Sequence, residues 1–292
     1  MKIIRTTFAL VLILLSPAAD AVDAPFLWQV QKAGGTPHYL LGSVHLLPED
    51  AADLPVAIDT VYARARGLVF ESDLDALKST DLQQRLLLSG RAGSGGLSAE
   101  VGPTLYARTQ ARLKSRGLPA SFCDALHAWS CGLFMELAAF SKAGFVGAAG
   151  IDEQLYERAG RDGKPRRGLE PAESQIALFT DMSNAMAKEV LAASIDDDDN
   201  GPDSPQAIYK AWRRNDISAL GTLVNDMRDR YPMFYERLLA ARNRAWMDEL
   251  PGIYAASQSQ LVVVGAAHCV GPDGLIGRLR ALGYAVDRYD LK

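Results

Sequence analysis

Gln260-Leu261-Val262-Val263-Val264-Gly265-Ala266-Ala267-His268 is an apolar run too short for a helix, and it ends in a glycine, two small residues and a histidine. This pattern predicts a buried strand with His268 at its tip. The same spacing occurs upstream, where Tyr39-Leu40-Leu41 leads into Gly42-Ser43-Val44-His45. Ligands of open α/β sheets gather at the carboxyl ends of strands, so the two Gly-x-x-His motifs predict a site shared by His45 and His268. Either histidine alone would be explained as an ordinary structural residue.

A third strand tip supplies a carboxylate. Phe26 to Val30 alternates like a strand and, with a Gly/Pro turn and the Tyr39 strand, predicts a hairpin that ends at His45. A helix is expected from Pro55 to near Gly67. The short apolar strand that follows, Leu68 to Phe70, ends in Glu71. We therefore expect Glu71 beside the two histidines, although a solvated strand end or a helix cap would also explain it.

The end of the chain predicts a further strand. A helix through Leu275 and Leu282, closed by Gly283, is followed by an alternating segment, Tyr284 to Tyr289. Together with the His268 strand this predicts a βαβ unit with a parallel pair of strands. Sheet strands thus come from both ends of the chain. The expected fold is α/β, with a mixed, partly parallel central sheet, flanking helices and a large helical insertion.

The insertion covers residues of about 75 to 250. A short extended segment near Lys164 to Leu169 interrupts it. Asp152 and Glu170 come next to predicted helix starts and are expected to be N-terminal helix charges. Trp246 is expected in the core. The predicted helices are Ala99 to Arg116, Asp124 to Lys142, Asp152 to Gly160, Pro171 to Ser194, Pro205 to Asn215, Ile217 to Arg230 and Met233 to Glu249.

Residues 1–21 have the pattern of a signal peptide: a basic start, a short apolar core and an Ala-x-Ala cleavage site at Ala19 to Ala21. The mature domain would cover residues 22–292 and be periplasmic or secreted. No apolar segment reaches the ~20 residues of a membrane span, so we expect no stable span after cleavage. A formal net charge of −4 without a dense basic face argues against a nucleic-acid partner.

Three cysteines leave the disulfide pairing open. If Cys123 and Cys131 lay on one helix they would be ~12 Å apart, so they can bond only if the helix begins after Cys123. Cys269 follows His268 and is expected to be a small buried apolar residue rather than a nucleophile or a metal neighbour. Asp196 to Asp199 resembles the start of a calcium loop, but Ala207 stands where the loop requires a bidentate glutamate. We expect a solvated acidic linker.

Several motifs, in their order and spacing, resemble the TraB/PrgY/GumN family over nearly the whole mature chain. This family is related to the Tiki metalloproteases and more distantly to erythromycin esterases and ChaN-like haem-binding proteins. The resemblance implies that His45, His268 and Glu71 form a metal-dependent peptidase site with Arg242 and Asn243 at its rim. Cys269 departs from the family pattern, in which an apolar residue is expected. The motifs are Trp28-x-Val30, Tyr39 to His45, Val69 to Glu71, Gly150 to Asp152, Gly168 to Gln175, Arg242-Asn243-x-x-Trp246 and Val264 to Gly271.

Three functions are compatible with these residues. The first is a metal-dependent hydrolase of a peptide or a small amide or ester, in which two imidazoles and one carboxylate hold zinc, manganese, cobalt or iron and activate water. Glu71 would be either a ligand or the general base. The second is a protein that sequesters a peptide or haem without turnover. The third is a metal-free esterase with a histidine base.

Overall fold

The computed structural model describes residues 26–51, 53–196, 201 and 204–290. The expected signal peptide and most of the expected acidic linker, residues 197–199, lie outside these ranges. Within them, none of the helices is both long enough and apolar enough to cross a membrane.

The described strands form a six-stranded sheet in the order β6-β4-β7-β2-β1-β8. The first four are parallel to one another, and β1 is antiparallel to both of its neighbours. This confirms the mixed α/β fold, the hairpin of β1 and β2, and the three strands that end at the candidate residues. The strands are β1 (Leu27–Gln31), β2 (His38–Ser43), β4 (Gly67–Phe70), β6 (Arg166–Gly168), β7 (Gln260–Gly265) and β8 (Ala285–Arg288).

The predicted βαβ pair is wrong in one respect. The strands β7 and β8 run in the same direction and α14 (Leu275–Ala281) connects them, but β2 and β1 lie between them. Both edges of β7 are already hydrogen-bonded, to β4 and to β2. The last strand therefore pairs with the free edge of β1, where Val30 lies opposite Val286.

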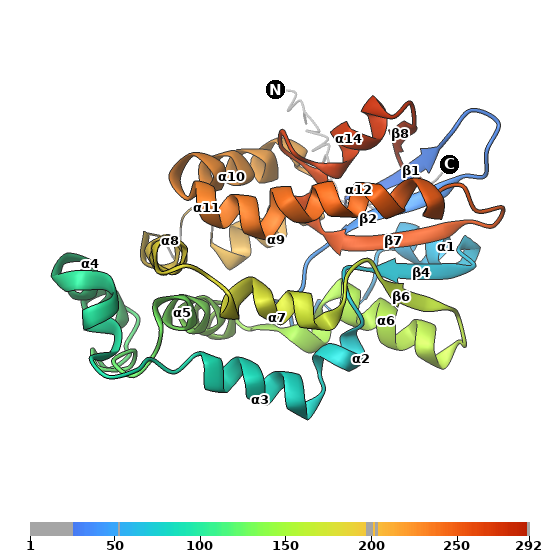
Figure 1. Ribbon diagram of the computed structural model, residues 1–292. Helices are drawn as coiled ribbons and strands as arrows, with labels where there is room; N and C mark the ends of the chain where they lie inside the picture. The colour runs from blue at the N-terminus through green and yellow to red at the C-terminus, as the bar shows by residue number, and fades with distance from the viewer. Residues whose placement is uncertain (1–25, 52, 197–200, 202–203, 291–292) are drawn as a thin grey trace, which may run out of the picture.

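Helices cover the sheet and extend beyond one end of it (Figure 1). The long helix α12 crosses one face of the sheet, and α6 comes directly before β6 in the chain. The helices that support the sheet and the site are α1 (Val56–Arg64), α6 (Ile151–Arg161), α7 (Ala172–Thr180), α9 (Pro205–Arg213), α10 (Ile217–Arg230), α12 (Ala241–Ile253) and α13 (Ala266–Cys269).

Two of the predicted helices are interrupted. The helix expected from Pro171 to Ser194 is two helices, because the Ser183 hydroxyl accepts a hydrogen bond from Met186 N and begins a new helix. The helix expected from Met233 to Glu249 contains a π-helical segment, Glu236–Ala240, just before α12. The remaining elements are α2 (Leu74–Leu77), α3 (Thr80–Ser89), α4 (Gly96–Ser115), α5 (Ala128–Lys142), α8 (Asn184–Asp196), α11 (Pro232–Tyr235), a 3₁₀ turn (Gly147–Ala149), and the small sheet of β3 (Leu47–Pro48) with β5 (Phe145–Val146).

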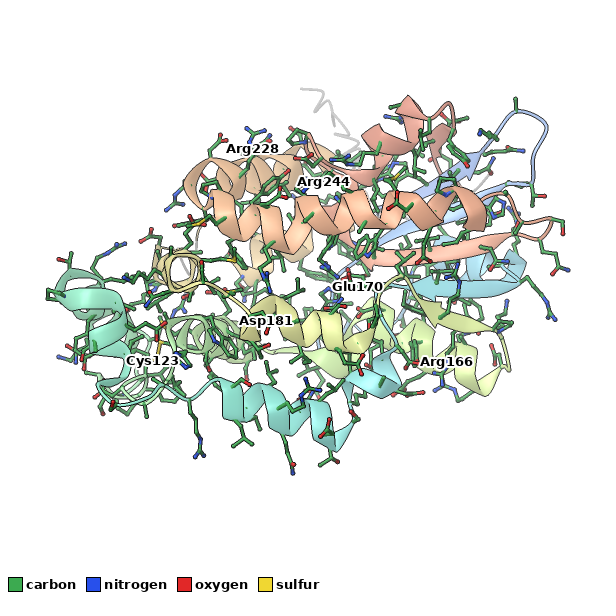
Figure 2. All side chains as sticks on the ribbon, viewed as in Figure 1. Cys123, Arg166, Glu170, Asp181, Arg228 and Arg244 are labelled. Atoms are coloured by element: carbon green, nitrogen blue, oxygen red, sulfur yellow. A yellow bond between two sulfur atoms is a disulfide. The ribbon has the colours of Figure 1, made fainter. Side chains whose placement is uncertain are left out.

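A second apolar cluster lies away from the sheet. It packs α4, α5 and α8 together and contains a disulfide between Cys123 and Cys131. Helix α5 begins at Ala128, after Cys123, which is the condition that the spacing imposed on this bond. Figure 2 shows Cys123 near α4 and α5, at the end of the molecule farthest from the sheet. Cys269 is a free, buried thiol, as expected.

Candidate functional site

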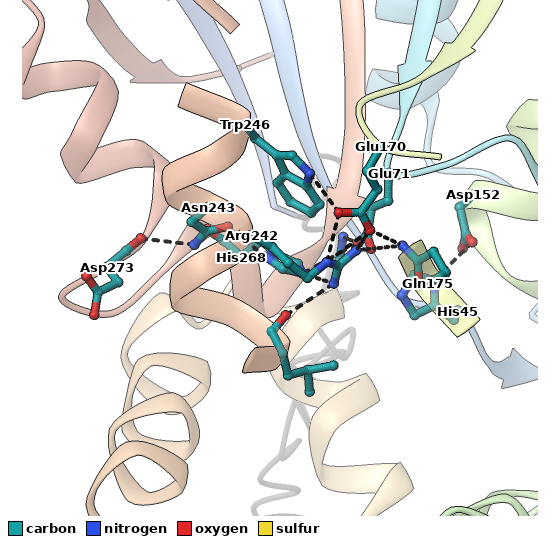
Figure 3. A network of polar contacts seen from close by, with 12 residues as sticks. His45, Glu71, Asp152, Glu170, Gln175, Arg242, Asn243, Trp246, His268 and Asp273 are labelled. Carbon is teal, nitrogen blue, oxygen red and sulfur yellow. Dashed lines mark hydrogen bonds and ion pairs between the residues drawn. The ribbon is translucent and has the colours of Figure 1, made fainter. Parts of the chain in front are cut away.

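Three neighbouring parallel strands end beside one another and deliver the three expected residues. In the register, Ser43 lies opposite Gly265, and Phe70 lies opposite Val263. Glu71 directly follows β4, and His45 comes two residues after β2. The chain turns from β7 straight into the short helix α13, which carries His268. Figure 3 shows these side chains within one polar network.

Glu71 is held as a carboxylate by donors on two sides. Its Oε1 accepts the backbone N–H of Gly265 at 2.6 Å, and its Oε2 accepts Arg242 Nη2 at 2.5 Å. Burial on its own would raise the pKa of Glu71, but Arg242, His45 and the Gly265 N–H together hold that pKa well below its usual range. Glu71 is therefore ionised at neutral pH.

His268 is enclosed, and both of its ring nitrogens are occupied. Nδ1 donates to Asn243 Oδ1 at 2.7 Å, and Nε2 accepts Arg242 Nη1 at 3.0 Å. Only 4 % of its side chain is exposed. Burial, aided by the charge of Arg242, lowers the pKa of His268 to about 3. His268 is thus a neutral residue in a fixed tautomer, and the adjacent Arg242 and Asn243 both contact its ring, one at each nitrogen.

His45 has the opposite environment. Its Nδ1 lies 2.9 Å from Asp152 Oδ2, while 59 % of its side chain is exposed. Asp152 raises the pKa of His45 to about 9, and Glu71 adds to the effect. The two carboxylates outweigh burial, which on its own would lower the pKa of His45. His45 is therefore protonated at neutral pH, with its Nε2–H available to the site.

Close backbone packing places Asp152. Ile151 N donates to Val44 O at 3.1 Å, and a Cβ on Gly150 would lie only 2.3 Å from the carbonyl oxygen of His45. The start of α6 is therefore docked against the residues around His45. Asp152 was expected to be only a helix charge, and the structure instead pairs it with a candidate catalytic residue.

Glu170 was also expected to be a helix charge, and it instead joins the site. It accepts Arg242 Nη2 at 2.7 Å and Gln175 Nε2 at 2.7 Å. Its backbone N–H donates to Glu71 O at 3.0 Å, so the two acids are tied side by side. Trp246, 1 % exposed and packed against His268, donates to Glu170 Oε2, which agrees with the core position expected for it. Figure 2 shows Glu170 between α7 and α12.

The two motif glycines have different roles. A Cβ at Gly42 would meet Ala266 Cα at 3.0 Å and Cys269 Sγ at 3.3 Å, so this glycine lets β2 pack against α13. A Cβ at Gly265 would instead lie 3.2 Å from Glu71 Oε1, 3.4 Å from His45 Nε2 and 3.6 Å from His268 Cδ2. The missing side chain leaves a space, which we call the Gly265 position, on which an ionised carboxylate and a protonated imidazole converge.

The arrangement does not fit the expected metal centre. Divalent metals bind a neutral imidazole through a free nitrogen lone pair, and both nitrogens of His268 are engaged. The guanidinium of Arg242 occupies the side of His268 that faces Glu71 and carries a positive charge there. Within the described residues no group of three or more His, Cys, Asp and Glu side chains is arranged to hold a metal ion. A cation held by His45, Glu71 and His268 would require Arg242 to move.

Two cavities meet at His45 and Glu71. A smaller one of about 240 Å³ is lined by His45, Glu71, Asp152 and Ser72 among others. A larger one of about 490 Å³ also reaches His45 and Glu71, and its lining includes Arg242 and His268. The second volume lies within the range of ~300–1,000 Å³ typical of ligand pockets.

Known proteins with similar sequences support the family resemblance that the motifs indicated. The chain is 26% identical over 256 residues to "Uncharacterized protein YbaP" of Escherichia coli (strain K12), an alignment that covers 85% of this chain and 89% of that protein. The protein of the same name from Shigella flexneri matches equally well. No solved structure matches the chain. A sequence model of the TraB/PrgY/gumN family matches residues 26–288. The chain therefore belongs to the TraB/PrgY/gumN family.

Proposed function

We propose that this protein is a hydrolase of amide or ester bonds in which Glu71 activates a water molecule and His45 protonates the leaving group. The Gly265 position carries the proposal, because Glu71 Oε1 and His45 Nε2 lie 3.2 Å and 3.4 Å from the same point. Their environments give Glu71 and His45 opposite protonation states at neutral pH, so that one can accept a proton and the other can donate one. Such a pair needs neither a serine nor a cysteine nucleophile.

The proposed hydrolysis consumes one water molecule and no other co-reactant. The water oxygen attacks the carbonyl carbon while Glu71 takes one of its protons, and a tetrahedral intermediate forms. Its collapse breaks the bond to the leaving nitrogen or oxygen, which takes the proton from His45 Nε2. Loss of the proton on Glu71 to the neutral His45, directly or through water, restores the resting state.

The other residues position this pair. Arg242 keeps Glu71 ionised and oriented, and Asp152 fixes the ring of His45 and stabilises its charge. The neutral His268 holds Arg242 in place from the opposite side, and Asn243 fixes the tautomer of His268. We assign these four residues to positioning.

The metal-dependent hydrolase implied by the family resemblance differs from this proposal in one measurable way. Hydrolysis by Glu71 and His45 alone survives treatment with a strong chelator. Hydrolysis that chelation abolishes and zinc, manganese or cobalt restores would support the metal centre, with Arg242 displaced. Tight peptide binding without turnover would support the sequestering protein.

The test uses a mixture of peptides and short-chain esters with and without chelator. Because general acid–base catalysis contributes ~10²–10⁴-fold, Glu71→Gln and His45→Gln are each expected to lower kcat by at least ~10²-fold. His45 is largely exposed, so His45→Gln should change thermal unfolding little. Glu71→Gln removes a charge from the buried pair with Arg242 and should lower stability, so kcat is compared at a temperature at which each variant is folded. Full activity in both variants would overturn the proposal.

We also propose that the protein works in an oxidising compartment, the periplasm or the exterior of the cell. The disulfide between Cys123 and Cys131 supports this, since such bonds persist in oxidising environments. Trapping of free thiols in extracts of the intact cell should label Cys269 alone after unfolding. Labelling of all three cysteines would contradict this localisation.

A further inference from the structure

The larger cavity has a distinctly apolar lining. Its ionisable residues other than Tyr209 are His45, Glu71, Arg242 and His268, and all four belong to the site. The rest of the wall is built mainly of aliphatic and aromatic side chains, among them Phe140, Phe179, Ile208, Leu223, Met227 and Leu238. One end of this cavity is thus the reaction site, and the remainder offers almost nothing to hydrogen-bond with.

An apolar space of this kind is costly to leave empty. Water needs two to four polar partners to be stable in a cavity, and the apolar walls of this one supply few. Unfilled apolar volume also destabilises a fold because the lining atoms lose contacts. Several of the lining residues, including Ile208 and Leu223, are only partly buried. A ligand that covers them would remove apolar surface from water.

The π-helical segment helps to shape the cavity next to the site. Leu238 and Leu239 in this segment line the cavity, and Leu238 O accepts Arg242 Nη1 at 3.2 Å. Such segments widen one turn of a helix and occur frequently at functional sites. The same backbone irregularity therefore presents two leucines to the cavity and helps to orient the arginine that holds Glu71.

The smaller cavity, which shares His45 and Glu71 with the larger one, has a more polar lining. It is lined by Asp152 and Ser72, which do not line the larger one. Asp152 Oδ1 and Ser72 Oγ are buried and have no hydrogen-bond partner among the described residues. Since Asp152 also holds the proposed acid His45, the leaving group belongs on this side. The acyl part then belongs on the side of Arg242 and His268, in the apolar cavity.

We infer that the substrate carries a bulky apolar group on the carbonyl side of the cleaved bond and a small polar leaving group. This inference rests on the proposed hydrolase function and gives it a substrate class. The apolar group can be an aliphatic acyl chain of several carbons or the apolar side chains of a peptide, since both present the same surface to the cavity. A short acyl group would leave the cavity unfilled, and a charged one would lose its hydration there without gaining a polar partner.

The first experiment varies the acyl group at constant leaving group. Monoacetyl, monobutanoyl and mono-octanoyl glycerol are compared with the peptides N-acetyl-Leu-Leu-Ser-amide and N-acetyl-Gly-Gly-Ser-amide. Each additional buried methylene is worth about tenfold or more in kcat/KM. We expect the octanoyl ester to exceed the acetyl ester by at least ~10²-fold. A preference confined to the ester or to the Leu-Leu peptide identifies which source of apolar groups is used.

The second experiment fills the cavity. Leu223→Trp on α10 and Ile208→Trp on α9 are expected to lower the octanoyl to acetyl ratio of kcat/KM by at least about tenfold. Ile217→Trp is the matched control, because Ile217 also lies on α10 but is 38% exposed and not in the cavity wall. It should keep the wild-type ratio. Two variants on different helices guard against a failure of either one to fold.

A binding measurement separates this inference from the proposed function. Calorimetric titration of the wild type with nonan-2-one and with acetone requires no turnover, because these ketones keep the octanoyl and acetyl groups but have no bond that the proposed reaction cleaves. Binding of nonan-2-one at least ~10²-fold tighter, lost in Leu223→Trp, supports the apolar site even if no ester is cleaved. Hydrolysis of acetyl and octanoyl esters at equal rates, or equal affinity for the two ketones, would overturn the inference and leave the hydrolase intact.

Discussion

Arg242 Nη1 lies 3.0 Å from Nε2 of His268, the ring nitrogen that a metal-binding histidine in this position would turn towards the site. His268 was expected to be a metal ligand, but its Nε2 instead accepts a hydrogen bond from Arg242. The same guanidinium also contacts Glu71, so a permanent positive charge lies against both residues, whose Nε2 and Oε1 atoms are 3.8 Å apart. The histidine pair is therefore unequal: His268 is neutral and structural, and His45 is charged and accessible.

Arg242 should be essential to stability. Arg242→Met would leave the buried carboxylates of Glu71 and Glu170 without their cation, and breaking a buried pair costs about 3–5 kcal/mol. We expect a loss of this size in the free energy of unfolding, measured by urea titration. Arg244→Met is the control on the same helix, since its ion pair with Glu236 is about half exposed and should be worth less than ~1 kcal/mol. Equal effects of the two changes would argue against a buried cation at the centre of the network.

Gly265→Ala should separate activity from folding. Gly265 has φ −54° and ψ 139°, which alanine adopts without strain, but its methyl group would enter the Gly265 position. Displacing the reacting water by about 1 Å can cost ~10²-fold in rate, so we expect kcat to fall by at least that factor while the melting temperature changes little. Gly42→Ala should do the reverse, because its Cβ would meet the Ala266 backbone, and overpacking costs about 1–3 kcal/mol. Full activity in Gly265→Ala would mean that the space has no role in catalysis.

Reduction of the disulfide should weaken the helical end of the molecule. Cys123 and Cys131 are eight residues apart, and chain entropy alone predicts a loss of about 2.5 kcal/mol on opening so short a loop. Urea unfolding of the wild type should show this loss when a reductant is added, and a Cys123→Ala, Cys131→Ala double variant should not respond to reductant. Cys269→Ala should keep the wild-type response. No change on reduction, with the open bond verified by mass, would contradict the prediction.

Acid should destabilise the protein through His38. This residue is fully buried, its Nδ1 accepts Gln260 N at 3.1 Å, and burial lowers its pKa below 6.5, an effect that the Ala256 backbone partly offsets. The folded state therefore favours neutral His38, and its stability is not reduced by this residue above pH 6.5, where His38 is neutral in both the folded and the unfolded chain. The free energy of unfolding decreases as the pH falls below that value, because His38 then binds a proton in the unfolded chain more readily than in the folded one.

The test for His38 compares unfolding free energies from about pH 8 to about pH 5. His38→Asn keeps an acceptor in the place of Nδ1 but does not titrate in this range. Its stability should fall less steeply with acid than that of the wild type. Parallel curves for the two proteins would assign the acid sensitivity to other groups.

The sequence by itself determined the strands, their tips and the residues that meet there. Two apolar runs each end in a glycine that is followed three residues later by a histidine, and a third run ends in Glu71. These signals were sufficient because parallel strands must end at a common edge. The apolar periodicity also located most of the helices. These signals are local, because each depends only on residues that are close together in the sequence.

Tertiary structure alone decided what those residues are chemically. Asp152 and Glu170 looked like helix charges, because the sequence cannot show that α6 docks against the backbone around His45 or that β6 ends beside β4. Such contacts give the two histidines different pKa values. Asp152 raises the pKa of His45, whereas burial and Arg242 lower the pKa of His268. Protonation states depend on desolvation and on charges brought together from distant parts of the chain, and distances across the fold are absent from a linear pattern.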